Sequence, residues 1–449
     1  MSMKVLFVVI MAALFAAGAF CQAPLSLEQA RELALRNSRS LAKYNLSFQS
    51  TKLTEDTQWY GDLPSFSLGL SASTTIIRND TTEDVFQTGP RTGISSGASF
   101  SISQKLFDGG RSSITKAINA LTTEMARLDA SSIYFSVLDS ADAAFYAVLG
   151  AQASLESAQK SMDTAALSNA MAEIRYESKM LSLGDYLQAM AQNEAAATSL
   201  TQAKRNVSVA RSQLANILGL TLKELPDLQA VDFTRYEPLL KTLSLFTDTQ
   251  IDTVSTLLLQ KATEKNPAFM KARLSSRIAQ ENVRLAKKDY MPTLNASVST
   301  GVNYNAANGL ERRAGTLSLS GSIPLDFWNT RVNVEKKELT AGQAALDVED
   351  SVASLAIDIQ SIILDLSTGA SSVLSSRRAL EYAEKHLEYV LELYRLSRNS
   401  LSELSDAEVL VSSNRRQFIQ SQFSFLTNLS KMRSLLVFDN EDEFTSLLQ

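Results

Sequence analysis

The residues that most often carry chemistry are scarce in this chain. Among its 449 residues, His386 is the only histidine and Cys21 the only cysteine. Catalytic triads, multi-histidine zinc sites, thiolate clusters and internal disulfides all need more of these residues. A net charge of −5 also argues against a nucleic-acid surface, which needs clustered lysine and arginine. The sequence therefore predicts a protein with no catalytic residues, no cofactor, no metal and no nucleic-acid partner.

The acidic residues with the most informative spacing follow serines in two related segments. Ser182 precedes Asp185 by three positions, and Ser400 precedes Glu403 by three. A serine at an N-cap with an acidic residue three positions later satisfies free N–H groups at a helix start. Helix capping is therefore our first interpretation of both segments. Asp406 lies one turn beyond Glu403 and is not needed for a cap.

Proline placement and apolar spacing predict very long helices around these segments. No proline lies between Pro90 and Pro226, and none follows Pro324. Within both stretches mostly apolar residues recur at alternating intervals of three and four, as in coiled-coil seams with imperfect core residues. A helix of about 60 residues would be about 90 Å long. The seams are Leu200, Ala203, Val207, Ala210, Leu214 and Ile217, and Phe418, Gln422, Phe425, Leu429, Met432 and Leu436.

Four short segments instead alternate with a period of two, which predicts strands. They are residues 66–73, 98–103, 294–299 and 317–323. Serine or asparagine occupies one face of each, and that face would meet water or a wet lumen. Polar loops would join the strands in pairs. The predicted loops are 79–92 and 305–313, and the predicted hairpins span about 64–107 and 293–325.

Four strands from one chain cannot span a membrane alone. An open sheet edge leaves backbone groups unpaired in lipid, and about eight strands is the smallest closed barrel. Several copies would have to share one barrel. Aromatic residues at the strand ends would then form a membrane-interface belt, or, in a soluble protein, pack at helix–strand junctions. These residues are Trp59, Tyr60, Phe107, Tyr290, Phe327 and Trp328.

The N-terminus has the features of an export signal. Lys4 precedes an apolar run over residues 5–20, and the small residues 17–19 offer a cleavage site. An uncleaved anchor is the competing interpretation. Cys21, directly after the run, is a candidate for lipidation, although Phe20 stands where a small residue is expected.

The chain also contains an internal repeat. Tyr176–Ala189 aligns without gaps on Tyr394–Ala407, at a constant offset of 218 residues. The order helix, hairpin, long helices occurs twice. We therefore predict a signal peptide (1–23), a first repeat (24–220, long helices 111–220), a connector (221–253), a second repeat (254–438, long helices 330–438) and a C-terminal tail (439–449).

Several short motifs follow the same twofold order. They are Leu27-Glu28-Gln29-Ala30, Ala34-Leu35-Arg36-Asn37, Leu63-Pro64, residues 106–111, Ala262 with Asn266-Pro267, and Met291-Pro292. Together they resemble the TolC family of outer-membrane efflux proteins over nearly all of the mature chain. The resemblance implies a mainly α-helical fold with membrane strands. Long antiparallel helices would form a periplasmic α-barrel, and each chain of a homotrimer would contribute four strands to a twelve-stranded outer-membrane β-barrel.

The same resemblance implies a function and partners. The protein would be the outer-membrane channel of a tripartite efflux or type I secretion system, conducting substrates passively. It would dock onto a periplasmic adaptor (a membrane fusion protein) and an inner-membrane RND or ABC transporter, and it would contact outer-membrane lipid. The alternative from another class is a periplasmic coiled-coil scaffold without a pore.

The repeated segment matches the family's periplasmic constriction. Glu403 and Asp406 fall on its paired acidic positions, Tyr394 on a gate tyrosine and Asp185 on an acidic partner. The family's gate arginine is replaced by Asn399, which hydrogen-bonds more weakly than a charge pair. Around a threefold axis, Glu403 and Asp406 would form stacked carboxylate rings that attract cations. Asp406 is the preferred gate candidate, because Glu403 also has a capping role.

Overall fold

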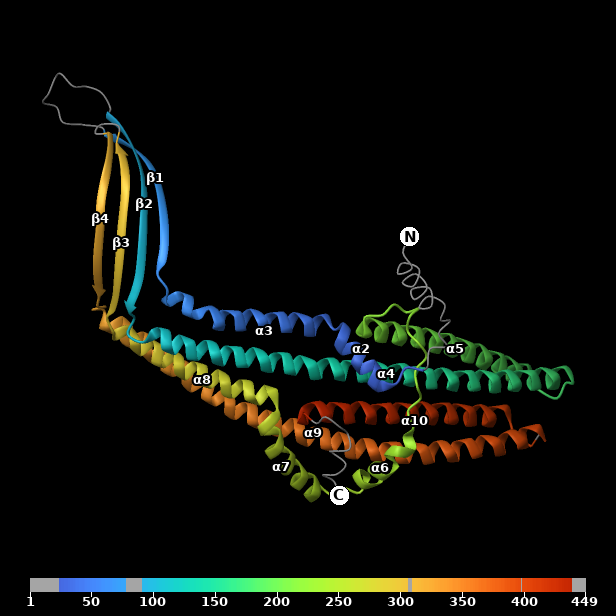
Figure 1. The fold of residues 1–449 in the computed structure, drawn as a ribbon. Coiled ribbons are helices and arrows are strands. Elements are labelled where there is room, and N and C mark those ends of the chain that lie inside the picture. Colours follow the sequence, from blue (N-terminus) through green and yellow to red (C-terminus); the bar gives the residue numbers. More distant parts are fainter. Residues whose placement is uncertain (1–23, 78–90, 306–308, 397, 438–449) are drawn as a thin grey trace, which may run out of the picture. The chain divides into compact units, whose positions relative to one another are not determined.

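A computed structural model describes residues 24–77, 91–305, 309–396 and 398–437 (Figure 1). The predicted signal peptide with Cys21, most of the 79–92 loop and the C-terminal tail lie outside the described residues. The chain divides into two compact units, and each takes residues from both sequence repeats. The first comprises Met1–Lys43, Ser131–Asn266 and Ala353–Gln449, and the second Tyr44–Ala130 and Pro267–Val352. The compact units therefore do not coincide with the sequence repeats.

Four antiparallel strands form one sheet in the second unit, in the order β1-β2-β3-β4. They are β1 (Ser65–Ile77), β2 (Arg91–Phe107), β3 (Thr293–Asn305) and β4 (Gly309–Ser322). The two hairpins are joined because β2 pairs with β3, a pairing that alternation alone did not reveal. The prediction of a loop over 305–313 is wrong, since Asn305 already pairs with Gly309. The charged side chains of that segment interrupt the alternation by which strands are predicted, whereas the backbone pairing does not depend on the side chains.

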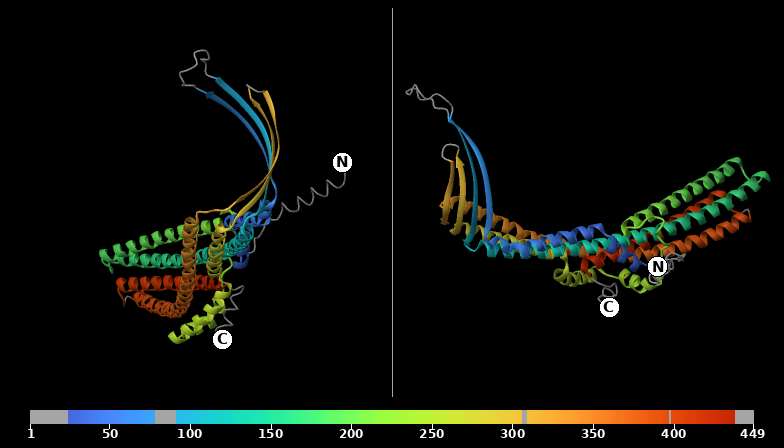
Figure 2. Two further views of the ribbon diagram at one scale, coloured as in Figure 1. Left: turned by 90° about the vertical axis from the view of Figure 1, so that its left-hand side faces the viewer. Right: turned by 45° about the horizontal axis from the view of Figure 1, so that its top comes forward.

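The two faces of this sheet differ in chemistry, because residues paired across antiparallel strands share a face. On one face Leu68 lies opposite Phe100, and the Leu68 side chain is 71% exposed. On the other face the Ser67 Oγ lies 2.6 Å from the Ser101 Oγ. Figure 2 shows the strands side by side as a curved, open sheet. Within the described residues, β1 and β4 each pair along one side only, so both edges are open.

Helices enter and leave the sheet at one end. The chain reaches β1 through α3 (Arg39–Thr57) and the 3-10 turn η1 (Gln58–Asp62), and β3 through α8 (Pro267–Lys287) and η3 (Lys288–Tyr290). It leaves β2 in α4 (Arg111–Glu177) and β4 in α9 (Phe327–Arg395). By length and composition alone, α4 and α9 would also pass as membrane spans. Core helices of soluble proteins pass the same test, so length and composition do not assign α4 and α9 to a membrane.

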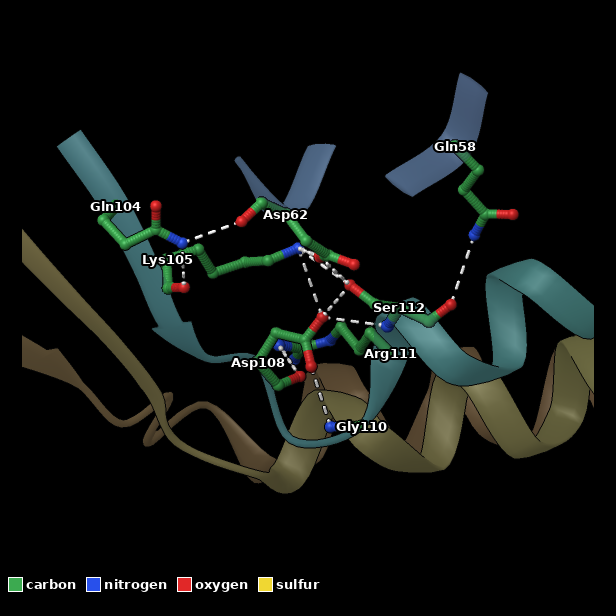
Figure 3. A network of polar contacts seen from close by, with 8 residues as sticks. All are labelled: Gln58, Asp62, Gln104, Lys105, Asp108, Gly110, Arg111 and Ser112. Atoms are coloured by element: carbon green, nitrogen blue, oxygen red, sulfur yellow. Dashed lines mark hydrogen bonds and ion pairs between the residues drawn. The ribbon is translucent and has the colours of Figure 1, made fainter. Parts of the chain in front are cut away.

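A polar network fixes the corner where β2 turns into α4 (Figure 3). The Lys105 ammonium lies 3.1 Å from Asp62 Oδ1 and 3.4 Å from Asp108 Oδ2. The Asp108 carboxylate accepts hydrogen bonds from the backbone N–H groups of Gly110 and Ser112, at 2.9 and 2.8 Å. Burial opposes the charge of Asp108, but the hydrogen bonds from Ser112 and Gly110 outweigh it and lower its pKa to about 2.

The first unit contains two helical hairpins and a short connector. The parts of α4 and α9 in this unit turn back as α5 (Leu183–Leu218) and α10 (Leu401–Leu436). The connector holds η2 (Phe233–Tyr236), α6 (Glu237–Ser244) and α7 (Asp248–Lys265), and α2 (Leu27–Asn37) lies near the N-terminus. The predicted seams contribute to the core, whose buried members include Ala203, Ala210, Leu214, Phe425, Leu429, Met432 and Leu436.

Two asparagines make matching contacts at the ends of α5 and α10. The Asn37 side-chain amide donates to the carbonyl of Leu218 at 2.7 Å. The Asn266 amide donates to the carbonyl of Leu435 at 3.0 Å. The last carbonyls of a helix have no partner within it, so each asparagine satisfies a group that burial would otherwise leave unpaired. This contact gives a physical reason for an asparagine in both sequence motifs.

Candidate functional site at the helix tips

Two turns end the helical hairpins of the first unit (Figure 1). Residues 178–182 join α4 to α5, and residues 396–400 join α9 to α10. Buried side chains from all four helices pack into one cluster at these turns, so the two tips form a single site. The buried members are Ala172, Ala189, Val390, Tyr394, Leu401, Leu404 and Ala407.

Ser182 and Ser400 lie at the N-caps of α5 and α10. The Ser182 Oγ accepts a hydrogen bond from the backbone N–H of Asp185 at 3.1 Å and donates to its carboxylate at 2.8 Å. The Ser400 Oγ accepts from the Glu403 N–H at 3.2 Å, and the Glu403 carboxylate accepts from the Ser400 N–H at 3.3 Å. Both carboxylates thus lie at helix N-termini, where the partial positive charge of the helix stabilises them.

Tyr394 is the most deeply buried of the candidate residues, with 1% of its surface exposed. The guanidinium carbon of Arg175 lies over its ring, 4.1 Å from the centroid. The same guanidinium donates a hydrogen bond to the Tyr394 backbone carbonyl. Burial raises the pKa of the Tyr394 hydroxyl, and the charge of Arg175 partly offsets this. Sequence reasoning missed Arg175, whose only signal was a basic side chain in the last turn of α4.

A groove of about 1060 Å³ lies between α4, α5 and α10 beside the tip cluster. Glu408 of α10 lines it and accepts a hydrogen bond of 2.7 Å from Ser168 of α4. Gln192 of α5 donates to the Ser405 hydroxyl of α10 at 2.6 Å. Burial raises the pKa of Glu408, and the bond from Ser168 lowers it in part. The two helical hairpins are therefore joined by polar side chains in addition to the apolar tip cluster.

The six aromatic residues of the predicted belt lie in the second unit, beside the ends of strands and at the helices that join them. Trp59 and Tyr60 meet edge to face with centroids 4.6 Å apart, and Tyr290 stacks with Phe327 at 6.2 Å. Tight packing at helix–strand junctions would bury them, but every one is exposed in the described chain. The exposed members are Trp59, Tyr60, Phe107, Tyr290, Phe327 and Trp328.

The sequence profile of the family described as "Outer membrane efflux protein" matches residues 30–220 and 258–436, which is most of the chain. The chain belongs to this family. The resemblance seen in the sequence motifs is thereby confirmed, and the protein is an outer-membrane protein.

Known relatives and solved structures agree with this membership. The chain is 23% identical over 335 residues to outer membrane protein TolC of Escherichia coli strain K12, covering 71% of this chain and 63% of that protein. It thus spans less than two thirds of the length of that relative. The fold is similar to that of the outer-membrane channel OprN, with a TM-score of 0.71, 18% identity and 91% and 89% of the two chains covered. The Campylobacter jejuni outer membrane channel CmeC gives a TM-score of 0.72, 13% identity and 94% and 89% coverage.

The positions matched to the constriction of this family are only partly brought together. Burial is the main cause of the raised pKa of the Tyr394 hydroxyl, and the negative charge of Asp185 adds to it. The Asp406 side chain is exposed and Asn399 is half-buried, and neither side chain hydrogen-bonds to another described residue. The hydrogen bond we considered for Asn399 is therefore not seen within the described part of this chain. Arg175, which is not among the predicted gate residues, contacts Tyr394.

Proposed function

We propose that this protein is an outer-membrane exit duct for a tripartite efflux or type I secretion system. The observation that carries the proposal is the sheet, which combines an exposed apolar face, a serine-lined face and two open edges. Lipid would cover the apolar face, and water in a lumen would wet the serines. Open edges are not tolerated in lipid, so strands from other copies must pair with β1 and β4.

A homotrimer is the assembly that we propose for this closure. Three copies of the four-stranded sheet would give a twelve-stranded barrel, which lies in the range found for outer-membrane proteins. The exposed Trp59 and Trp328 would then lie at the periplasmic membrane interface, where aromatic rings are favoured. The helical hairpins would extend into the periplasm and surround the path of the substrate.

The duct would conduct passively, with energy supplied by its partners. We propose that a periplasmic adaptor and an inner-membrane RND or ABC transporter complete the system. The similar solved structures OprN and CmeC are described as outer-membrane channels, which supports a non-catalytic role. Opening of the helix tips would be a shift between closed and open populations, biased by adaptor contacts. Rings of Glu403 and Asp406 at the tips would favour cations near the entrance.

Single-channel recording in planar lipid bilayers tests this function directly. Protein extracted from outer membranes in detergent should insert and give discrete conductance steps, and chemical cross-linking should yield a trimer. Thr316→Pro should disrupt strand β4, and Asn206→Pro should disrupt helix α5. Conductance of the two variants would therefore show separately whether the sheet and the helices are needed. A folded oligomer that never conducts would instead support a scaffold without a pore, and a water-soluble monomer would contradict the shared barrel.

A further inference from the structure

We propose that Arg175 is a positioning residue that holds the α9–α10 tip against the α4–α5 tip, and so keeps the entrance closed. The proposal rests on the duct function above. Arg175 would act in place of the cation that the resemblance places at position 399, where this chain has an asparagine. The α4–α5 hairpin thus supplies the cation, and the α9–α10 hairpin supplies Tyr394, which the cation contacts.

Two contacts fix the guanidinium of Arg175 on Tyr394. The guanidinium lies over the face of the ring, 4.1 Å from its centroid, and it donates a hydrogen bond to the backbone carbonyl of the same residue. Arginine can stack on a ring and donate along its plane at the same time, and the compact ammonium of lysine cannot reproduce this geometry. The contact therefore selects arginine by shape as well as by charge.

The position of Arg175 also suits two helix ends at once. It lies in the last turn of α4, and its hydrogen-bond acceptor lies in the last turn of α9. Carbonyl groups at helix C-termini lack partners and carry partial negative charge. A single cation between two such ends stabilises both. Separation of the tips would remove the cation from the end of α9 and leave the Tyr394 carbonyl to water.

The burial of the Tyr394 hydroxyl opposes this contact, so the tips can separate. The Tyr394 hydroxyl is buried and makes no hydrogen bond of good geometry to a described residue, with the Arg175 guanidinium near it, so burial of the ring costs part of the hydration of that group. Tip opening would return the hydroxyl to water. The closed tip is thus held by Arg175 and the apolar cluster and opposed by the buried hydroxyl. Such a balance suits an element that partners must be able to open.

Arg395 provides a matched control on the neighbouring helix. It is the last residue of α9, directly after Tyr394, and its side chain is half exposed. Its guanidinium pairs with Glu392 of the same helix at 2.9 Å. Removal of Arg395 thus deletes an arginine from the same tip without deleting a hydrogen bond or ion pair between the two helical hairpins of the described chain.

Amide hydrogen exchange of the purified full-length protein tests the proposal, with residues 390–410 as the reporter. Arg175→Ala should speed exchange there by about tenfold, the effect expected from a desolvated cation–π contact. Arg175→Lys should give an intermediate rate, and Arg395→Ala should match the unchanged protein. Equal exchange in Arg175→Ala and the unchanged protein, or equal effects of Arg175→Ala and Arg395→Ala, would overturn the proposal.

A second variant keeps the test decisive if Arg175→Ala does not fold. Tyr394→Phe retains the ring and the carbonyl but removes the buried hydroxyl, so exchange at the tip should become slower. Faster exchange in Tyr394→Phe would contradict the assigned balance. Single-channel open probability, measured in parallel, separates the two proposals. Absence of conductance in the unchanged protein would contradict the duct function but not the contact of Arg175 between the tips. Conductance and hydrogen exchange that are both unaffected by Arg175→Ala would contradict only the role of Arg175.

Discussion

Ser168 of α4 donates a hydrogen bond of 2.7 Å to the carboxylate of Glu408 on α10, inside the interface of the two hairpins. Burial raises the pKa of Glu408 above its usual 4.5, because the charged form is poorly solvated there. The packed state therefore binds a proton more tightly than the unfolded chain. Packing of α4 on α10 should be most stable below the usual pKa and should weaken as pH rises through the raised value.

Glu408→Gln should remove this pH dependence, because the neutral amide avoids the buried charge. At pH 7 the variant should melt at a higher temperature than the unchanged protein, and the difference should vanish near pH 4. Thermal unfolding followed by circular dichroism between these pH values measures it. Glu388→Gln, at an exposed position of α9, is the control and should leave the profile unchanged. An identical pH profile for Glu408→Gln and the unchanged protein would rule out Glu408 as the source.

Asp142→Ala should be one of the most destabilising single substitutions in the first unit. The carboxylate of Asp142 is fully buried and pairs with Arg31 at 2.6 Å and with Arg433 at 3.1 Å. Removal of one partner leaves buried charge uncompensated, which costs about 3–5 kcal/mol. Urea unfolding of the detergent-solubilised protein measures the loss. Asp163→Ala, at an exposed position of the same helix, should change stability by no more than about 0.5 kcal/mol.

Gly109→Ala should destabilise the corner between β2 and α4. Gly109 has a φ of +70°, and an added Cβ would lie 2.6 Å from the Cβ of Met291. Left-handed backbone strain and this clash together should cost about 1–3 kcal/mol. Gly342→Ala is the counterpart in α9, where nothing lies within 4 Å of the added methyl, and it should stabilise by about 0.5–1 kcal/mol. Similar melting shifts for both variants would contradict the corner geometry.

Asp406→Ala should reduce the cation preference of the proposed duct, because the proposed trimer would lose one ring of three exposed carboxylates. Reversal potentials across a salt gradient measure the preference in bilayers. Glu264→Ala, at an exposed position of α7, removes the same charge outside the tips and should leave the reversal potential unchanged. Equal cation selectivity in Asp406→Ala and the unchanged protein would contradict the assignment of Asp406 to the gate.

Much of the local structure follows from the sequence alone. Alternation with a period of two located the strands, and serines three positions before Asp185 and Glu403 stand at the starts of α5 and α10. The twofold set of motifs led to the family that the profile match confirms. Periodicity and capping act between residues a few positions apart, so they can be read directly from the chain.

The contacts between distant segments were decided only by the tertiary structure. Arg175 and the Tyr394 carbonyl are 219 positions apart, and Asp142 and Arg433 are 291 apart. No spacing rule connects such pairs, because the turns of the helical hairpins and the packing of their side chains bring them together. Backbone pairing likewise extended β4 through charged residues that side-chain alternation had assigned to a loop. Patterns along the chain thus specify which elements form, and packing between them specifies which side chains meet.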